Sequence, residues 1–262
     1  MSPLFSEAGL GCLEHAVADG LLCAFDFDGT LSPIVAKPED ARLPDNIRER
    51  LLTLGRYSPI AIITGRSVED LRSRLGFSPD YVVGNHGLEG VPGWENLARE
   101  HEAACKNWRR QLEEALALPE FDRGIQLEDK RYSMSVHYRH VGDVEKSASQ
   151  LEMLFATLSP APRIVAGKCV FNLLAEDRCH KGSALVRLME LAGAPGALYV
   201  GDDVTDEDVF RMRRDDVLSV RIEHSADSAA DFFLPHPRDI LRFLDELITR
   251  LDAAGSTNWL AK

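Results

Sequence analysis

A short apolar run that ends in two aspartates constrains this chain more than any other feature. Residues 21–25 are all apolar, and the segment Asp26-Phe27-Asp28-Gly29 follows directly. An apolar run of this length bounded by a glycine turn predicts a buried strand. The aspartates then lie where a strand leaves its sheet, which is where open α/β sheets bind ligands. Because two close carboxylates repel each other, the motif indicates either a divalent-cation site or a polar turn.

A second acidic cluster favours the cation site. The apolar run 197–200 ends in Gly201-Asp202-Asp203, and Asp206 follows three residues later. Two strand ends that both carry carboxylates predict one divalent-metal site between them. The alternative for Asp206 is that it only complements the dipole of a helix that starts there.

The spacing of apolar segments predicts a parallel sheet. Near-continuous apolar strands separated by amphipathic helices are typical of a sheet that is covered on both faces. The predicted strands span residues 21–26, 59–63, 81–83, 197–200, 217–222 and 231–234. One predicted helix begins after Pro44, and a second begins at Ser67 and ends at Gly76. Three further helices are predicted over residues 181–192, 206–213 and 237–251.

The pattern changes between the third and fourth of these strands. A long amphipathic helix over 95–118 precedes an alternating strand over 132–138, a helix around Leu151 and a hairpin over 163–174 that turns at Gly167-Lys168. We therefore predict an α/β core formed by residues 1–95 and 179–262, with an inserted α+β domain over residues 96–178.

The charge and the cysteine content limit which partners and which cellular location we expect. The chain has 262 residues and a formal net charge of −12, which disfavours nucleic-acid and anionic-membrane partners. Its five cysteines are scattered and include no C-x-x-C pair, and neither a signal peptide nor a transmembrane run is evident. These features predict a cytoplasmic protein.

Two further segments could bind an oxyanion. The strand over 59–63 ends in Thr64-Gly65-Arg66, and a hydroxyl beside a helix start favours phosphate. Lys181 opens another predicted helix, where it could neutralise phosphate or keep an aspartate ionised. Thr64 could instead be only a helix cap, and Lys181 only a solvated lysine. Taken together, carboxylates, hydroxyl and lysine at strand ends and helix starts fit metal-assisted phosphoryl transfer.

The four motifs in this order resemble the haloacid-dehalogenase-like phosphatase superfamily. They read D-x-D-G-T-L from Asp26, T-G-R from Thr64, the lysine at 181, and G-D-D-x-T-D from Gly201. The resemblance implies a Rossmann-like parallel-sheet core of the haloacid-dehalogenase type and makes the inserted α+β domain a cap.

The same resemblance implies a role for each motif residue. Asp26 would be the nucleophile that forms an aspartyl-phosphate, and Asp28 would be the general acid and base. Thr64 and Lys181 would hold the phosphate. Mg²⁺ would be bound by Asp26, Asp202 and the backbone carbonyl of Asp28, with Asp203 and Asp206 as supporting residues.

Further motifs, in the core and in the inserted domain, narrow the resemblance to the trehalose-6-phosphate phosphatases. These motifs are the segments 84–89, 127–130, 136–139 and 167–168, and the His180-Lys181-Gly182 run. The resemblance implies hydrolysis of trehalose 6-phosphate, with a functional link to a separate trehalose-phosphate synthase. The implied substrate-binding residues are Gly65, Arg66, Asn85, His86, Glu128, Lys130, His137, Arg139 and Asn172.

One position departs from that family. Asn172 stands where the family usually has a glutamate, so one charge-assisted contact to the sugar is replaced by a neutral one. The alternative within the same class is a phosphatase for another phosphorylated disaccharide or glycoside, such as sucrose phosphate. A sugar-phosphate-binding regulator without catalysis is a second alternative, but such a module would not need the acid Asp28.

Overall fold

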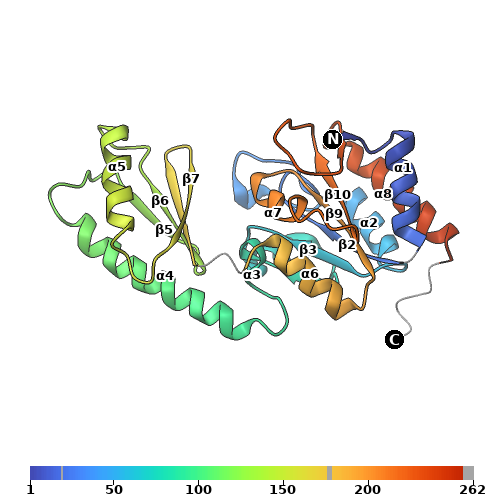
Figure 1. Ribbon diagram of the computed structural model, residues 1–262, viewed down its shortest axis with the longest axis horizontal. Coiled ribbons are helices and arrows are strands. Elements are labelled where there is room, and N and C mark those ends of the chain that lie inside the picture. Colours follow the sequence, from blue (N-terminus) through green and yellow to red (C-terminus); the bar gives the residue numbers. More distant parts are fainter. Residues whose placement is uncertain (19, 176–178, 256–262) are drawn as a thin grey trace. The chain divides into compact units, whose positions relative to one another are not determined.

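The computed structural model describes residues 1–18, 20–175 and 179–255 and divides the chain into two compact units (Figure 1). Unit 1 combines residues 1–91 with the chain from residue 179 onward, and unit 2 spans residues 92–178. The first crossing thus falls four residues before the predicted boundary at 95, within a segment that contains Pro92 and Gly93.

Unit 1 is built on a seven-stranded sheet in which every neighbouring pair is parallel, as predicted. The strand order is β1-β11-β10-β9-β2-β3-β4, which places β2 between β9 and β3. The strands are β1 (Ser2–Pro3), β2 (Leu21–Phe25), β3 (Ile60–Ile63), β4 (Tyr81–Val83), β9 (Gly196–Gly201), β10 (Val217–Ile222) and β11 (Phe232–Leu234). The sequence analysis did not predict β1, because two residues carry no periodic signal.

Helices cover both faces of this sheet. Successive strand residues point to opposite faces, so Cys23 and Phe25 join the apolar cluster formed with α1, α2, α3 and α8, whereas Leu22 and Ala24 are equally buried outside that cluster. On the Leu22 and Ala24 side, α6 packs against β2 and β3. The helices are α1 (Glu7–Ala18), α2 (Asp45–Leu54), α3 (Val68–Leu75), α6 (Lys181–Ala192), α7 (Glu207–Phe210) and α8 (Asp239–Ala253).

The helix predicted over 206–213 is shorter than expected. A 3-10 turn, η3 (Val204–Asp206), precedes the single-turn helix α7. The Asp206 carboxylate accepts hydrogen bonds from the backbone amides of Asp202 and Asp203, so it tightens the loop instead of starting a regular helix. The other 3-10 turns are η1 (Pro38–Asp40) and η2 (Asn85–Gly87).

Unit 2 is an α+β unit with a four-stranded antiparallel sheet in the order β5-β6-β8-β7. Its elements are α4 (Glu95–Leu116), β5 (Gln126–Asp129), β6 (Ser133–His137), α5 (Val144–Phe155), β7 (Arg163–Gly167) and β8 (Val170–Leu174). One face of the sheet packs on α4 and α5 through Trp108, Phe155 and Phe171. The strand register places Glu128, Ser135 and Asn172 in one row on the opposite face.

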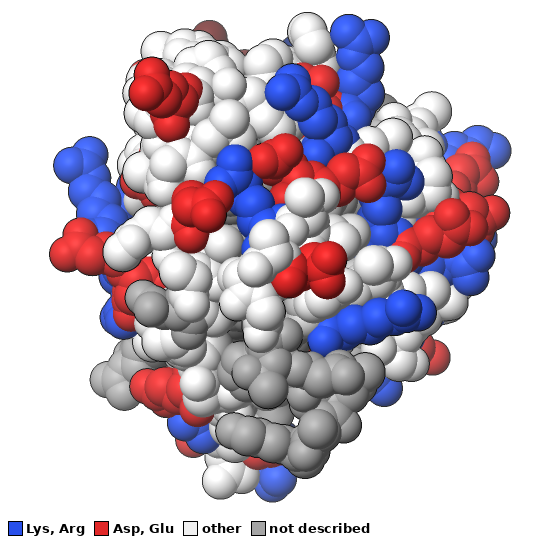
Figure 2. Space-filling view, turned by 90° about the vertical axis from the view of Figure 1, so that its right-hand side faces the viewer, with Lys and Arg blue, Asp and Glu red and all other residues white. Residues whose placement is uncertain are grey.

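Acidic and basic side chains are interspersed, rather than gathered by sign, on the face of the protein drawn in Figure 2. Ion pairs tie neighbouring helices of unit 1 together, Arg250 on α8 to Glu14 on α1 and Arg50 on α2 to Asp245 on α8. In the described residues, no helix is both long and apolar enough to cross a membrane.

Candidate active site

The predicted site residues of unit 1 follow three adjacent strands. Asp26 follows β2, Thr64 follows β3 and Asp202 follows β9, and the carboxyl ends of parallel strands meet at one edge of a sheet. Backbone bonds continue the ladders past the strand ends, because Asp26 N donates to Val200 O (2.8 Å) and Thr64 N donates to Val83 O (2.9 Å). The sheet itself therefore fixes where these side chains begin.

Lys181 is the buried cation of the site. Its side chain is 1% exposed, and Nζ donates to Asp26 Oδ1 and to Asp206 Oδ1, both at 2.7 Å. Burial by itself would lower the pKa of Lys181, but the charges of Asp26 and Asp206 outweigh burial and raise that pKa. Lys181 is consequently a charged group inside the site and not a solvated lysine.

The backbone before Lys181 is also fixed. The His180 side chain caps α6, since its Nδ1 accepts from the amides of Gly182 (3.1 Å) and Ser183 (3.3 Å). Gly87, with a φ of +110°, lies against the backbone of His180, where a Cβ would come within 2.5 Å of the His180 carbonyl. These contacts place the start of α6 directly beside the strand ends.

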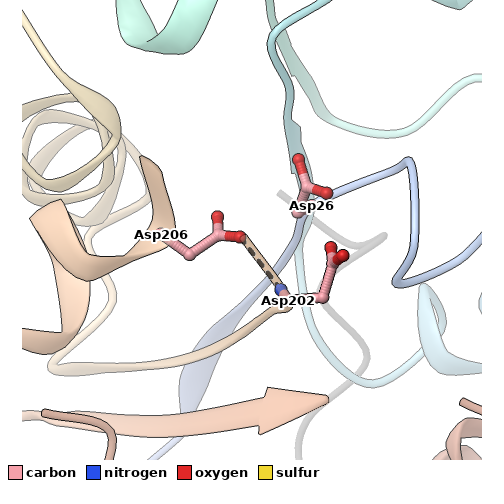
Figure 3. A group of neighbouring side chains, drawn as sticks. All are labelled: Asp26, Asp202 and Asp206. Carbon is pink, nitrogen blue, oxygen red and sulfur yellow. Dashed lines mark hydrogen bonds between the residues drawn. The ribbon is translucent and has the colours of Figure 1, made fainter. Parts of the chain in front are cut away.

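Asp206 organises the acidic loop. It is completely buried, and its Oδ1 accepts from the Tyr199 hydroxyl (2.6 Å) in addition to Lys181. Its Oδ2 accepts from the amides of Asp202 and Asp203, both at 2.9 Å, the first of which is the dashed line in Figure 3. Both oxygens accept hydrogen bonds from protein donors, so Asp206 stabilises the loop that carries Asp202.

Three carboxylates, those of Asp26, Asp202 and Asp206, converge on one space (Figure 3), with an oxygen of each within 4.8 Å of the others. Burial, partly offset by Lys181 and reinforced by Asp206, raises the pKa of Asp26 to about 8. Burial and then repulsion from Asp206 raise the pKa of Asp202 to about 6. A bound divalent cation would favour the ionised carboxylates and so lower these pKa values. Clustered carboxylate oxygens suit a hard cation, so the residues fit Mg²⁺.

Asp26 and Asp202 are better placed than Asp206 to hold a metal ion, because the oxygens of Asp206 already accept four protein hydrogen bonds. Asp202 is oriented by Thr30, whose hydroxyl donates to Asp202 Oδ1 (3.1 Å). Gly29 lies against the same carboxylate with a φ of +84°, and a Cβ there would overlap both Asp202 oxygens. The glycine of the first motif is thus needed for the approach of Asp202.

Asp28 has a different environment from Asp26. Its side chain is 41% exposed and does not join the group of three carboxylates. Both of its oxygens accept from Arg66, with Nε to Oδ2 at 2.6 Å and Nη2 to Oδ1 at 2.7 Å. Arg66 was predicted to contact substrate, but its guanidinium is directed at Asp28, Asp70 and the carbonyl of Pro38.

The remaining predicted residues of unit 1 surround Thr64. Thr64 is buried, its Oγ1 accepts from Arg66 N (3.2 Å), and its carbonyl accepts from His86 N (2.9 Å). Thr64 is not the cap of the following helix, because Ser67 caps α3 by accepting from Asp70 N. A Cβ on Gly65 would meet the His86 ring.

Asn85 and Asp203 have local backbone roles in the structure. The Asn85 amide donates to Glu89 Oε2 (2.7 Å), which also accepts from Val68 N (2.9 Å) and so braces η2 against the start of α3. The Asp203 side chain accepts from Val204 N (2.7 Å) at the start of η3.

In unit 2, the predicted sugar contacts group on the sheet face away from α4 and α5. Glu128 Oε2 is 2.9 Å from His137 Nε2 and 3.7 Å from Lys130 Nζ. Asn172 Oδ1 accepts from the Ser135 hydroxyl (2.6 Å). Arg139 is exposed in the turn that follows β6.

Sequence reasoning missed three contributors. The Tyr199 hydroxyl donates to Asp206, and the Ser135 hydroxyl donates to Asn172. The Thr30 hydroxyl donates to Asp202. Tyr199 could have been noticed as the hydroxyl-bearing residue in an apolar strand, and Ser135 as the polar residue between Met134 and Val136.

Comparison with solved structures supports the fold. The structure is similar to that of a trehalose-6-phosphate phosphatase from Aspergillus fumigatus, with a TM-score of 0.66 and 24% sequence identity over 95% of this chain and 99% of that chain. At this identity the likeness establishes the fold alone.

The family follows from the sequence comparison. Residues 24–237 match the model of the trehalose-phosphatase family, so the chain belongs to this family. A trehalose-phosphate phosphatase of Mycobacterium tuberculosis is 31% identical over 266 residues, which are 94% of this chain and 66% of that protein. An uncharacterized glycosyl hydrolase of the same organism is 34% identical over 245 residues, 87% of this chain and only 18% of that protein.

The buried acidic network predicts that Asp206→Asn destabilises the protein. The amide nitrogen cannot accept the bonds that the carboxylate accepts, and Lys181 loses one of its two counter-charges. We expect the free energy of unfolding in urea to fall by about 3–5 kcal/mol, as for other broken buried ion pairs. The matched control is Asp215→Asn in the exposed turn before β10. This substitution should change the free energy of unfolding by less than about 0.5 kcal/mol. Equal stabilities of the two variants would contradict this account.

Proposed function

We propose that this protein is a Mg²⁺-dependent phosphatase that hydrolyses trehalose 6-phosphate to trehalose and phosphate. The observation that carries the proposal is the buried Lys181 between Asp26 and Asp206, with the carboxylate of Asp202 beside them. Membership of the trehalose-phosphatase family supports the substrate. The carboxylate oxygens and the family together support the metal.

In the proposed first step, an oxygen of Asp26 attacks the phosphorus atom and displaces the sugar oxygen, forming an aspartyl-phosphate. Asp28 gives a proton to the leaving oxygen as its bond to phosphorus breaks. Lys181 has three N–H donors and uses two on carboxylates, so the third can hold a phosphate oxygen together with the Thr64 hydroxyl. Bound Mg²⁺, held by Asp26, Asp202 and the carbonyl of Asp28, would supply positive charge that offsets the repulsion between carboxylate and phosphate.

In the proposed second step, water attacks the phosphorus atom of the aspartyl-phosphate. Asp28 takes the proton of that water, and the bond between phosphorus and Asp26 breaks to release phosphate. One carboxyl group thus serves as acid and then as base, which returns the protein to its starting protonation.

We assign sugar recognition to unit 2. Glu128, Lys130 and His137 offer donors and acceptors on one sheet face, which suits a ligand rich in hydroxyls. Asn172 and Arg139 complete this set, and Asn85 and His86 are assigned to the part of the substrate nearest the phosphate. The chemical groups lie in unit 1, so chemistry and recognition would be divided between the two units.

A second candidate substrate is another phosphorylated disaccharide, such as sucrose 6-phosphate. The neutral Asn172, already bonded to Ser135, is the observation that favours it. In either case the substrate is a small sugar phosphate. For trehalose 6-phosphate we propose a cytoplasmic reaction that consumes the product of a separate trehalose-phosphate synthase.

Phosphate release from a panel of sugar phosphates tests the proposal. We expect trehalose 6-phosphate to be hydrolysed with a higher kcat/KM than sucrose 6-phosphate, no release in EDTA, and recovery when Mg²⁺ is added. Asp202→Asn should raise the Mg²⁺ concentration for half-maximal rate by more than about tenfold. A chelated enzyme that keeps its rate would rule out the metal site, and a preference for sucrose 6-phosphate would select the second candidate.

The nucleophile is tested separately by Asp26→Asn. An amide cannot form the aspartyl-phosphate, so we expect kcat to fall by about 10⁴-fold or more while the far-ultraviolet circular dichroism stays unchanged. Substantial turnover in a folded Asp26→Asn protein would assign the nucleophile to another group.

Recognition by unit 2 predicts substrate-dependent losses. Glu128→Ala and Lys130→Ala should lower kcat/KM for trehalose 6-phosphate by about tenfold or more, the value of one charged hydrogen bond. Hydrolysis of p-nitrophenyl phosphate, which has no sugar, should stay within about twofold. The control is Arg110→Ala, an exposed arginine on α4 that pairs with Glu114. If both substrates lose activity equally, these residues act on folding and not on recognition.

A further inference from the structure

The T-G-R arginine lies in a chain of alternating charges that ends at Asp28. We define this charged chain as Arg74, Asp70, Arg66 and Asp28. Arg74 donates to Asp70 through Nε (2.9 Å) and Nη2, and Arg66 donates to Asp70 through Nη1 (2.7 Å). The other edge of the Arg66 guanidinium donates to both oxygens of Asp28.

The chain is anchored at its far end. The Arg74 side chain is only 8% exposed, and its Nη1 donates to the carbonyls of Glu39 (2.9 Å) and Ala41 (3.0 Å) around η1. Asp70 is held from both sides, and hydrogen bonds from Arg74 and then Arg66 lower its pKa. Asp70 therefore remains a charged, fixed acceptor for Arg66.

The guanidinium of Arg66 is held in one orientation. Its side chain is 12% exposed, and its Cζ lies 5.7 Å from the centroid of the Phe27 ring. The described contacts to Asp28, Asp70 and the Pro38 carbonyl (3.0 Å) use four of the five N–H donors that an arginine has. At most one donor is left for a substrate, too few for a two-pronged grip on phosphate.

We propose that Arg66 is a positioning residue that acts through Asp28 by fixing the orientation of its carboxyl group, and not a residue that binds the phosphate. The inference rests on the proposed role of Asp28 as acid and base. Asp28 is 41% exposed on a short side chain, and a two-pronged contact with a rigid partner restricts its rotation. When Asp28 carries the proton, its carbonyl oxygen still accepts from Arg66 while its O–H is directed to the leaving oxygen.

A double-substitution cycle tests this proposal on the full chain with Mg²⁺ present. Arg66→Ala should lower kcat for trehalose 6-phosphate by about tenfold or more, because it removes part of the contribution of general acid–base catalysis. The KM should stay within about threefold of that of the unsubstituted protein. In the Asp28→Asn background, Arg66→Ala should lower kcat by no more than about twofold, because the residue through which it acts is gone. A full further loss in that background, or a loss mainly in KM, would overturn the proposal.

The leaving group supplies a second readout that does not depend on the cycle. Phenyl phosphate needs a proton on its leaving oxygen more than p-nitrophenyl phosphate does, and neither carries a sugar. If Arg66 positions the acid, Arg66→Ala should slow phenyl phosphate more than p-nitrophenyl phosphate. Equal losses on the two aryl phosphates would indicate a phosphate contact and contradict the inference.

Matched variants separate positioning from folding. Arg50→Ala removes an arginine that also holds an aspartate, Asp245, with two hydrogen bonds, but on the exposed side of α2, so it should leave kcat unchanged. Asp70→Asn loosens Arg66 from the opposite side and should give a smaller kcat loss that again disappears in the Asp28→Asn background. If Arg66→Ala fails to fold, Asp70→Asn and Arg66→Lys, which cannot make the two-pronged contact, decide the question.

Full activity of Asp28→Asn on trehalose 6-phosphate would refute the proposed acid and base role itself. That outcome is distinct from an inactive Asp28→Asn protein in which Arg66 proves independent of Asp28.

Discussion

The site depends on one buried cation, the ammonium of Lys181 between Asp26 and Asp206. Burying a charge is costly unless it is paired and hydrogen-bonded, and here two carboxylates at 2.7 Å meet that requirement. The pairing joins the start of α6 to Asp26 after β2 and to Asp206 in η3. Removing Lys181 would leave two buried carboxylates without their cation, so the fold and the proposed chemistry depend on the same residue.

Asp206 shows how a supporting residue can matter as much as a reacting one. It receives four hydrogen bonds and shapes the loop that carries Asp202, yet its oxygens have little capacity left for a metal ion. Tyr199, inside β9, provides one of those bonds. Gly29 and Thr30 then set the position of Asp202 from the other side. The carboxylates of the acidic motif are therefore not equivalent, because Asp206 holds the loop and Asp202 is left to serve as the proposed metal ligand.

The two aspartates of the first motif have opposite surroundings although only one residue separates them. Asp26 is buried against Lys181, whereas Asp28 is partly exposed and held by Arg66. A buried carboxylate with a fixed cation suits a nucleophile, and an exposed carboxyl group suits proton exchange with a leaving group and with water. Burial and charge partners therefore support the division of roles that we propose for the two aspartates.

The parallel sheet, and the edge of it where the site lies, could be predicted from the sequence alone. Apolar runs of the length of a strand alternate with amphipathic helices, and the carboxyl ends of parallel strands must meet, so Asp26, Thr64 and Asp202 could be placed together. The pairing of side chains that are distant in the sequence became evident only in the folded structure. Lys181 meets an aspartate 155 residues away, and Arg66 meets Asp28 rather than open solvent. Such pairings depend on how helices pack on the sheet, which local periodicity does not encode.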